Sequence, residues 1–110
     1  MISYEDFTKV DIRVGTIVDV EEVPGGRRPA LKLFIEFGLG IGKKKTSAQI
    51  THLYNKEKLV GRQVLAVVNF PPKQVGSFMS EVLVLGLSNK HNEIVLIGPD
   101  ELVPNGEKLH

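Results

Sequence analysis

The stretch that decides the fold class is IRVGTIVDV, residues 12–20. Apolar or β-branched side chains stand at every second position from Ile12 to Val20, which is the period of a strand that has one face in a core. Pro24, Gly25 and Gly26 end the pattern soon afterwards. We therefore predict a first strand over residues 12–20, with Val14 and Val18 among its buried side chains.

A second alternating stretch, residues 31–37, predicts the neighbouring strand. Its inward face carries Leu31, Leu33, Ile35 and Phe37, while Lys32, Phe34 and Glu36 face outward. Phe34 is the odd apolar residue on the outer side. A shift of one residue in this register would reverse every facing assignment in the strand.

Short strands and turns continue through the rest of the chain. Gly38, Gly40 and Gly42 predict a hairpin, a polar strand follows over residues 43–50, and a helical turn is expected near Leu59. Apolar runs at 63–70, 81–85 and 94–97 complete five or six strands, and Ser3 caps a short helical turn before the first. The 110 residues predict one all-β domain, a small closed or partly closed barrel. Its predicted core comprises Val14, Val18, Leu33, Ile35, Val64, Val68, Val84 and Leu96.

Composition excludes several function classes. Hydrophobic residues make up 42% and charged residues 25%, which is typical of a globular domain, and the formal net charge of +1 argues against strong non-specific nucleic-acid binding. Cysteine is absent, so no disulfide or thiolate chemistry is available. We find neither a membrane-length apolar run nor a signal peptide, and so expect a cytoplasmic protein without membrane insertion.

Catalytic and metal motifs are also missing. The three histidines, His52, His91 and His110, are far apart in the sequence, and no Gly-x-Ser-x-Gly elbow is present. Gly42-Lys43 is followed by Lys44, where a phosphate-binding loop needs Ser or Thr. We predict no metal, no cofactor and no enzymatic activity.

The remaining signal is a set of basic and amide side chains that strand alternation brings to one surface. Lysines 43–45 have a second interpretation, because lysine also keeps an exposed strand edge soluble. Phe34 and Phe78 are candidates for stacking on bases or holding apolar side chains, although an outward Phe more often packs than binds. The set consists of Arg27, Arg28, Lys32, Lys43, Lys45, Ser47, Gln49, Asn69 and Lys73.

Six segments, in order, resemble one known family. They are DIRVG (11–15), PALKL (29–33), SAQIT (47–51), VVNFPP (67–72), SEVL (80–83) and VPNG (103–106). Together they are similar to the CsaA secretion-chaperone family, a branch of the tRNA-binding domains also found at the C-terminus of methionyl-tRNA synthetases. The resemblance covers nearly the whole chain.

This resemblance implies a five-stranded Greek-key OB-fold that forms a homodimer, with residues 1–10 and 99–110 as extensions at the interface. It implies binding of unfolded or export-bound polypeptides, with structure-specific tRNA binding as the alternative. Gln74 and Met79 are uncharged where relatives are more basic, which weakens the tRNA alternative. By position, Arg27, Lys32, Ser47, Gln49, Asn69 and Ser80 match the family's recurring polar residues.

From the strand alternation and the family resemblance together, we predict one shared groove for polypeptide or tRNA. Phe34, Phe78 and Met79 are its expected apolar contacts, with Arg27, Lys32 and Lys73 as its polar rim. In the tRNA alternative, Lys43 and Lys45 join the phosphate contacts, and Asn69 and Ser80 contact sugar or base edges. The full set of predicted binding residues is Arg27, Lys32, Phe34, Lys43, Lys45, Ser47, Gln49, Asn69, Lys73, Phe78, Met79 and Ser80.

Overall fold

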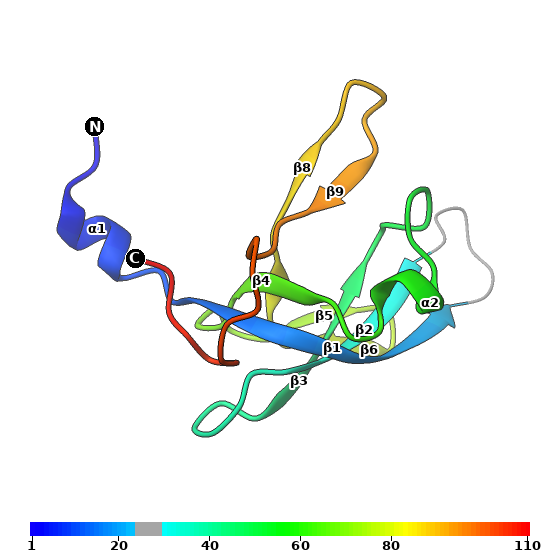
Figure 1. Ribbon diagram of the computed structural model, residues 1–110, viewed down its shortest axis with the longest axis horizontal. Helices are drawn as coiled ribbons and strands as arrows, with labels where there is room; N and C mark the ends of the chain where they lie inside the picture. Colours follow the sequence, from blue (N-terminus) through cyan, green and yellow to red (C-terminus); the bar gives the residue numbers. More distant parts are fainter. Residues whose placement is uncertain (24–29) are drawn as a thin grey trace.

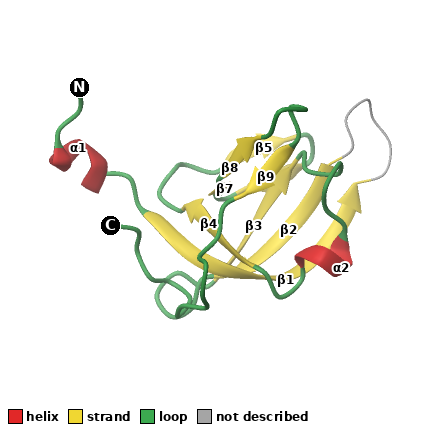
Figure 2. Cartoon of the chain, turned by 45° about the horizontal axis from the view of Figure 1, so that its top comes forward, coloured by secondary structure: helices red, strands yellow, loops and turns green. Residues whose placement is uncertain are grey.

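A curled antiparallel sheet of five strands forms the body of the molecule (Figures 1 and 2). The computed structural model describes residues 1–23 and 30–110. The sheet order is β3-β2-β1-β4-β7, in which the first three strands form a meander and β4 returns to the far side of β1. The strands are β1 (Ile12–Val23), β2 (Ala30–Glu36), β3 (Lys43–Ala48), β4 (Gln63–Val67) and β7 (Leu83–Val84). This Greek-key order confirms the predicted OB-type barrel.

Two short helices and two hairpins surround this sheet. Helix α1 (Tyr4–Thr8) precedes the barrel, and α2 (Lys56–Leu59) connects β3 to β4 and buries Leu59. The hairpin of β5 (Lys73–Val75) and β6 (Phe78–Ser80) lies between β4 and β7 in sequence. A second hairpin, β8 (Gly86–Ser88) with β9 (Ile94–Leu96), projects from the barrel (Figure 1). Neither helix of the described residues is long and apolar enough to cross a membrane.

The register predicted for the second strand is confirmed. Leu31, Leu33, Ile35 and Phe37 are all buried, and Phe34 lies half-buried on the opposite face. Each side chain follows the alternation of an extended backbone, so the pattern in the sequence determines the facing. Of the other predicted core residues, Val64 and Leu96 are buried, while Val68 and Val84 are partly buried against the core.

The prediction that Val18 lies in the core is wrong. A β-bulge between Ile17 and Asp19 shifts the register of β1 against β2, and Val18 is 43% exposed. A bulge sets two residues opposite one, so the inward positions change from Ile17 on one side of it to Val20 on the other. Alternation counted straight through this point therefore fails.

Val14 is buried as predicted, but on the outer face of the sheet and not in the barrel core. A Cβ on its neighbour Gly15 would meet Ile35 in the core at 2.6 Å, so Gly15 faces inward and Val14 faces outward. The final segment pairs with the edge of β1 that β2 leaves open, and the amide of Val14 donates to the Glu107 carbonyl at 3.1 Å. Side chains of Pro104 and residues 107–110 line a pocket with Val14 and Leu65 on this outer side. The final segment is thus part of the structure of β1.

Buried polar groups close the seam of the barrel between β3 and β7. Thr46 is 2% exposed, and its hydroxyl donates to the Val82 carbonyl at 2.8 Å. It also accepts a hydrogen bond from the Ser80 hydroxyl at 2.7 Å, because its own hydrogen is used by the Val82 carbonyl. This seam connects the barrel to the β5–β6 hairpin through side chains.

Candidate functional site

The outer face of β2 and β3 is basic, with one aromatic residue. The pairing register sets Lys32 opposite Ser47, Phe34 opposite Lys45 and Glu36 opposite Lys43, all on the side away from the core. Gln49 continues this side beyond the end of β3 and is exposed. Five predicted site residues of the two strands therefore share one face: Lys32, Phe34, Lys43, Lys45 and Ser47.

The β5–β6 hairpin contributes the second wall of the site. Its register pairs Lys73 with Ser80 and Val75 with Phe78, so these four side chains share one face of the hairpin. Gln74 and Met79 form the pair on its other face. Met79 is exposed and does not share the face of Phe78, although the two are neighbours in sequence.

Phe78 connects the two walls. The Nζ atoms of Lys32 and Lys45 lie 4.9 Å and 5.2 Å from the centroid of its ring. At these distances the ring quadrupole attracts both ammonium groups. The predicted convergence of Lys32 and Phe78 on one groove is therefore present in the geometry, with Lys45 joining them.

Hydrogen bonds fix the hairpin against the edge of β3. Lys45 donates its amide to Oε1 of Glu81 at 3.1 Å and accepts the Glu81 amide on its carbonyl at 2.8 Å. The Ser47 amide donates to Oγ of Ser80 at 3.1 Å. These bonds satisfy edge amides that an exposed strand would leave open. Ser80 thus positions the site, because its hydroxyl is already engaged by Ser47 and Thr46.

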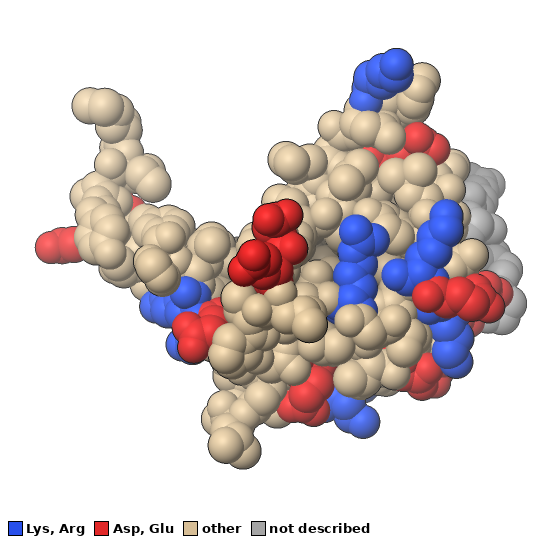
Figure 3. Space-filling view, viewed as in Figure 1, with Lys and Arg blue, Asp and Glu red and all other residues tan. Residues whose placement is uncertain are grey.

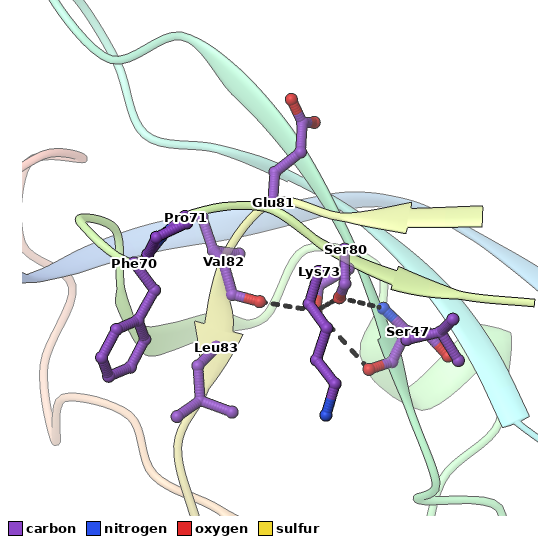
Figure 4. Close-up of a pocket in the computed structure, with 10 residues that line it drawn as sticks. Ser47, Phe70, Pro71, Lys73, Ser80, Glu81, Val82 and Leu83 are labelled. Carbon is purple, nitrogen blue, oxygen red and sulfur yellow. Dashed lines mark hydrogen bonds between the residues drawn. The ribbon is translucent and has the colours of Figure 1, made fainter.

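A cavity of about 500 Å³ opens beside this junction (Figure 4). Phe70, Val75 and Leu83 line it, and they are 53%, 46% and 50% exposed. Figure 4 shows the side chains of Phe70, Leu83 and Lys73 extending to the same side, while Glu81 points away from them. The remaining lining residues are Thr46, Ser47, Pro71, Ser80, Glu81 and Val82. The cavity is mostly apolar, and Lys73 and Glu81 are its charged lining residues.

Sequence reasoning missed the apolar part of this cavity. Phe70 and Pro71 end the run after β4, and Val75 and Leu83 lie in strands of three and two residues. Such short strands have no alternation long enough to assign a face. In the sequence, only the Pro71-Pro72 pair indicates that the chain leaves the sheet after Phe70.

Asn69 has a structural role in this fold. Its Oδ1 accepts the Asp11 amide at 3.0 Å, and its Nδ2 donates to the Lys9 carbonyl at 2.8 Å. Both ends of the amide therefore hold the segment that joins α1 to β1. Arg27, also a predicted site residue, lies outside the described residues.

Two carboxylates away from the cavity have shifted pKa values. Hydrogen bonding from the Val20 amide, followed by Lys56, lowers the pKa of Asp19. Bonds from the backbone and then the hydroxyl of Ser3 lower the pKa of Asp6, which completes the capping box of α1. Both shifts favour the ionised form and stabilise local structure. Within residues 1–23 and 30–110, no three His, Asp or Glu side chains are grouped to hold a metal ion.

The outer face of β1 and β4 differs from that of β2 and β3 because it is apolar. Val14 pairs with Leu65, Val67 pairs with Leu83, and both valines are buried. Exposed apolar residues border this face: Leu83, which pairs with Val67, and Val103 and Leu109, which line a pocket with Val14 and Leu65. Figure 3 shows a notch between α1 and the β8–β9 hairpin whose walls are mostly uncharged atoms, with a group of acidic atoms on the barrel side at its base.

The sequence and the fold both match known proteins. A family model described as "Putative tRNA binding domain" matches residues 12–108. The chaperone CsaA of Bacillus anthracis is 49% identical, with a TM-score of 0.92 over 100% of this chain and 99% of that one. The CsaA chaperone of Picrophilus torridus is also 49% identical, with a TM-score of 0.90 and 100% coverage of both chains. The chain belongs to the CsaA branch of the tRNA-binding domain family.

A curated relative of this CsaA-type domain is the methionine–tRNA ligase of Nanoarchaeum equitans. It is 36% identical over 110 residues, which are 99% of this chain and 14% of the ligase. The chain thus spans about one seventh of that relative's length. The family predicted from the six sequence segments is confirmed.

Proposed function

We propose that the chain acts as a homodimer that binds unfolded or export-bound polypeptide segments, as a CsaA-like chaperone. The observation that carries this proposal is the apolar cavity beside Phe78, which exposes large fractions of Phe70, Val75 and Leu83. Exposed apolar side chains in a concave site bind apolar ligands by removing area from water. A polypeptide that has not folded presents such side chains in an extended backbone.

The proposed contacts extend the cavity along the basic face. Phe78 and Phe34 supply aromatic surface, while Lys32 and Lys73 form a polar rim at which a client's own polar groups stay solvated. Met79, exposed on the back of the hairpin, adds a flexible apolar contact there. Arg27 belongs to this proposal by its position in the sequence alone.

The site is proposed as non-catalytic. The hydroxyls of Thr46 and Ser80 are bonded to each other, and they also engage the Val82 carbonyl and the Ser47 amide. A nucleophilic hydroxyl needs an adjacent general base, and here the partners are a second hydroxyl and backbone groups.

Homodimer formation is proposed from the apolar face of β1 and β4. Ile2 and Tyr4 are 76% and 75% exposed, and α1 has no buried residue of its own. Surfaces of this kind are typical of interfaces, and a two-fold axis would let α1 of each chain cover the notch of the other. The second copy is therefore the proposed occupant of the notch in Figure 3.

tRNA binding is the second candidate function. The observation in its favour is the Lys32–Phe78–Lys45 contact, which combines two cations with an aromatic ring on the face that OB-folds use for nucleic acid. Lys43 and Gln49 extend that face along β3.

A salt titration separates the two candidates. The affinities for a reduced, unfolded polypeptide and for tRNA are measured from about 50 to 200 mM salt, a range over which a complex with many phosphate contacts weakens steeply. We expect polypeptide affinity to change little and to fall when Val75 and Phe78 are replaced by Ala. Failure of the intact protein to bind any unfolded polypeptide would contradict the proposed function.

A further inference from the structure

We infer that the Lys32–Lys45 pair makes this site selective for client segments that carry a carboxylate two residues from a bulky apolar side chain. The inference rests on the proposed polypeptide binding and specifies which polypeptides are favoured. The ligand class is an extended segment with the pattern apolar-x-acidic or its reverse. Three observations on the β3 edge support this pattern.

First, two ammonium groups share one aromatic ring. Both Nζ atoms lie within 5.2 Å of the Phe78 centroid. Neither forms a salt bridge with a carboxylate of the described residues, and residues 24–29 contain no Asp or Glu. Both ammonium groups, on half-buried lysines, are therefore free of ion pairs with the described residues.

Second, the neighbouring carboxylates form no ion pair with either ammonium group. Glu21 stands opposite Lys32 in the β1–β2 register, yet the Lys32 ammonium lies over the Phe78 ring. Glu81 receives the amide of Lys45 on Oε1 and points away from the Lys73 side chain (Figure 4). An anion supplied by a ligand is what this part of the site lacks.

Third, the spacing between lysine and cavity matches an extended peptide. Ser47 lines the cavity, and Lys45 lies two residues before it on the same face of β3. At roughly 3.3 Å per residue, two strand positions span about 6.6 Å. Side chains i and i+2 of an extended client have the same spacing and point to the same side. An apolar residue in the cavity thus brings position i+2 to the lysines.

The test compares three nine-residue peptides that contain one Leu and, two positions later, Glu, Gln or Lys. Fluorescence anisotropy gives their affinities for the intact protein at about 50 and 150 mM salt. The Debye length is shorter at the higher concentration, so attraction between charges is weaker there. We expect the Glu peptide to bind about tenfold more tightly than the Gln peptide at low salt, and the Lys peptide most weakly. The ratio of Glu to Gln affinities should approach one in the Lys32→Gln/Lys45→Gln variant.

Lys90→Gln, at the tip of the β8–β9 hairpin, is the matched control and should keep the wild-type ratio. Equal binding of the Glu and Gln peptides by the wild type would overturn the inference, while binding of an unfolded polypeptide would leave the proposed function standing. The inference would also be overturned if the double variant lost tRNA affinity while its ratio of Glu-peptide to Gln-peptide affinities stayed unchanged. The two lysines would then bind tRNA phosphates and not client carboxylates. If neither the peptides nor an unfolded polypeptide bind, the proposed function fails together with the inference.

Discussion

The outer face of the sheet has two halves with opposite chemistry. On β1 and β4 it presents Val14, Leu65 and Val67, which residues 104–110 partly cover. On β2 and β3 it presents Lys32 and Lys45, joined by the ring of Phe78. The buried core shows no such division, because Thr46 is the one polar side chain among the buried residues that the structure describes.

We propose from this difference that one barrel separates assembly from ligand binding. Val14 and Val67 are themselves buried, but exposed apolar side chains at the margin of their half, such as Val103 and Leu109, are costly unless another surface covers them, which suits a permanent partner. A face of lysines and one aromatic ring is stable while exposed and can release what it binds. We assign the β1–β4 half to a second copy of the chain and the β2–β3 half, with the cavity, to the client.

The largest expected effect is on stability, and it differs between substitutions on the inner and outer faces of β2. Leu33→Ala should lower the free energy of unfolding by about 2–5 kcal/mol, because it removes a fully buried side chain and leaves a cavity. Its neighbour Lys32 faces outward, and Lys32→Ala should change stability by about 0.5 kcal/mol or less. Urea unfolding measures the stability of the two variants. Equal losses of unfolding free energy would contradict the assignment of Leu33 to the inner face and Lys32 to the outer face of β2.

The next effect concerns the apolar half and its proposed partner. Ile2→Ser removes an exposed apolar side chain from the segment before α1, and a fully buried one stabilises by about 1.5–3 kcal/mol. Because both copies of the homodimer carry the change, the dimer Kd should rise about 100-fold or more. Sedimentation velocity across a dilution series measures it, with Leu39→Ser on the β2–β3 turn as the control. A monomeric wild type at micromolar concentration would refute the dimer.

The seam that joins the barrel to the binding half gives a third prediction. Thr46→Val removes the donor to the Val82 carbonyl, and a buried group left unpaired costs about 1–3 kcal/mol. The half-buried Thr16 donates its hydroxyl to Oδ1 of Asn105, and Thr16→Val should cost less. Thermal unfolding compares the two variants. Client affinity should also fall in Thr46→Val alone, because Thr46 holds the hairpin through Ser80.

The smallest effect is the pH dependence of α1. Asp6 has a lowered pKa in the folded chain, so the stability that it contributes is present above the ordinary value of 3.8 and is lost as the pH falls through the folded value. Backbone NMR shifts of residues 4–8 should report fraying of the helix at low pH. Asp6→Asn should flatten that dependence, and a helix indifferent to both changes would argue against the capping role.

The sequence predicted the strands in which alternation is unbroken. In β2 every inward residue is apolar, so the facing of Leu33 and Phe34 follows directly. In β1 the bulge at Val18 interrupts the count, and no residue type there announces it. Val14 shows a second limit, because a strand covered on both faces carries apolar residues on both, and the pattern cannot say which one faces the core.

The candidate site was predictable in its polar part. Lys32 and Phe78 were expected in one groove and lie in contact, because the family's motifs and the strand period both bear on their positions. Phe70 and Leu83 depended on how the connection between β4 and β7 folds, which is set by tertiary contacts of very short strands. Side chains such as Asn69 look like ligand contacts in sequence, but its bonds within the fold appear only in three dimensions.

Mapping a bound client by NMR tests the central claim most directly. An unfolded polypeptide is titrated into the isotope-labelled protein, and amide shift changes are followed residue by residue. We predict changes at Ser47, Val75 and Phe78, around the cavity and the basic face, with Val14 and Leu109 unaffected. Changes confined to Val14, Leu109 and the rest of the β1–β4 half would contradict the division between assembly and client binding.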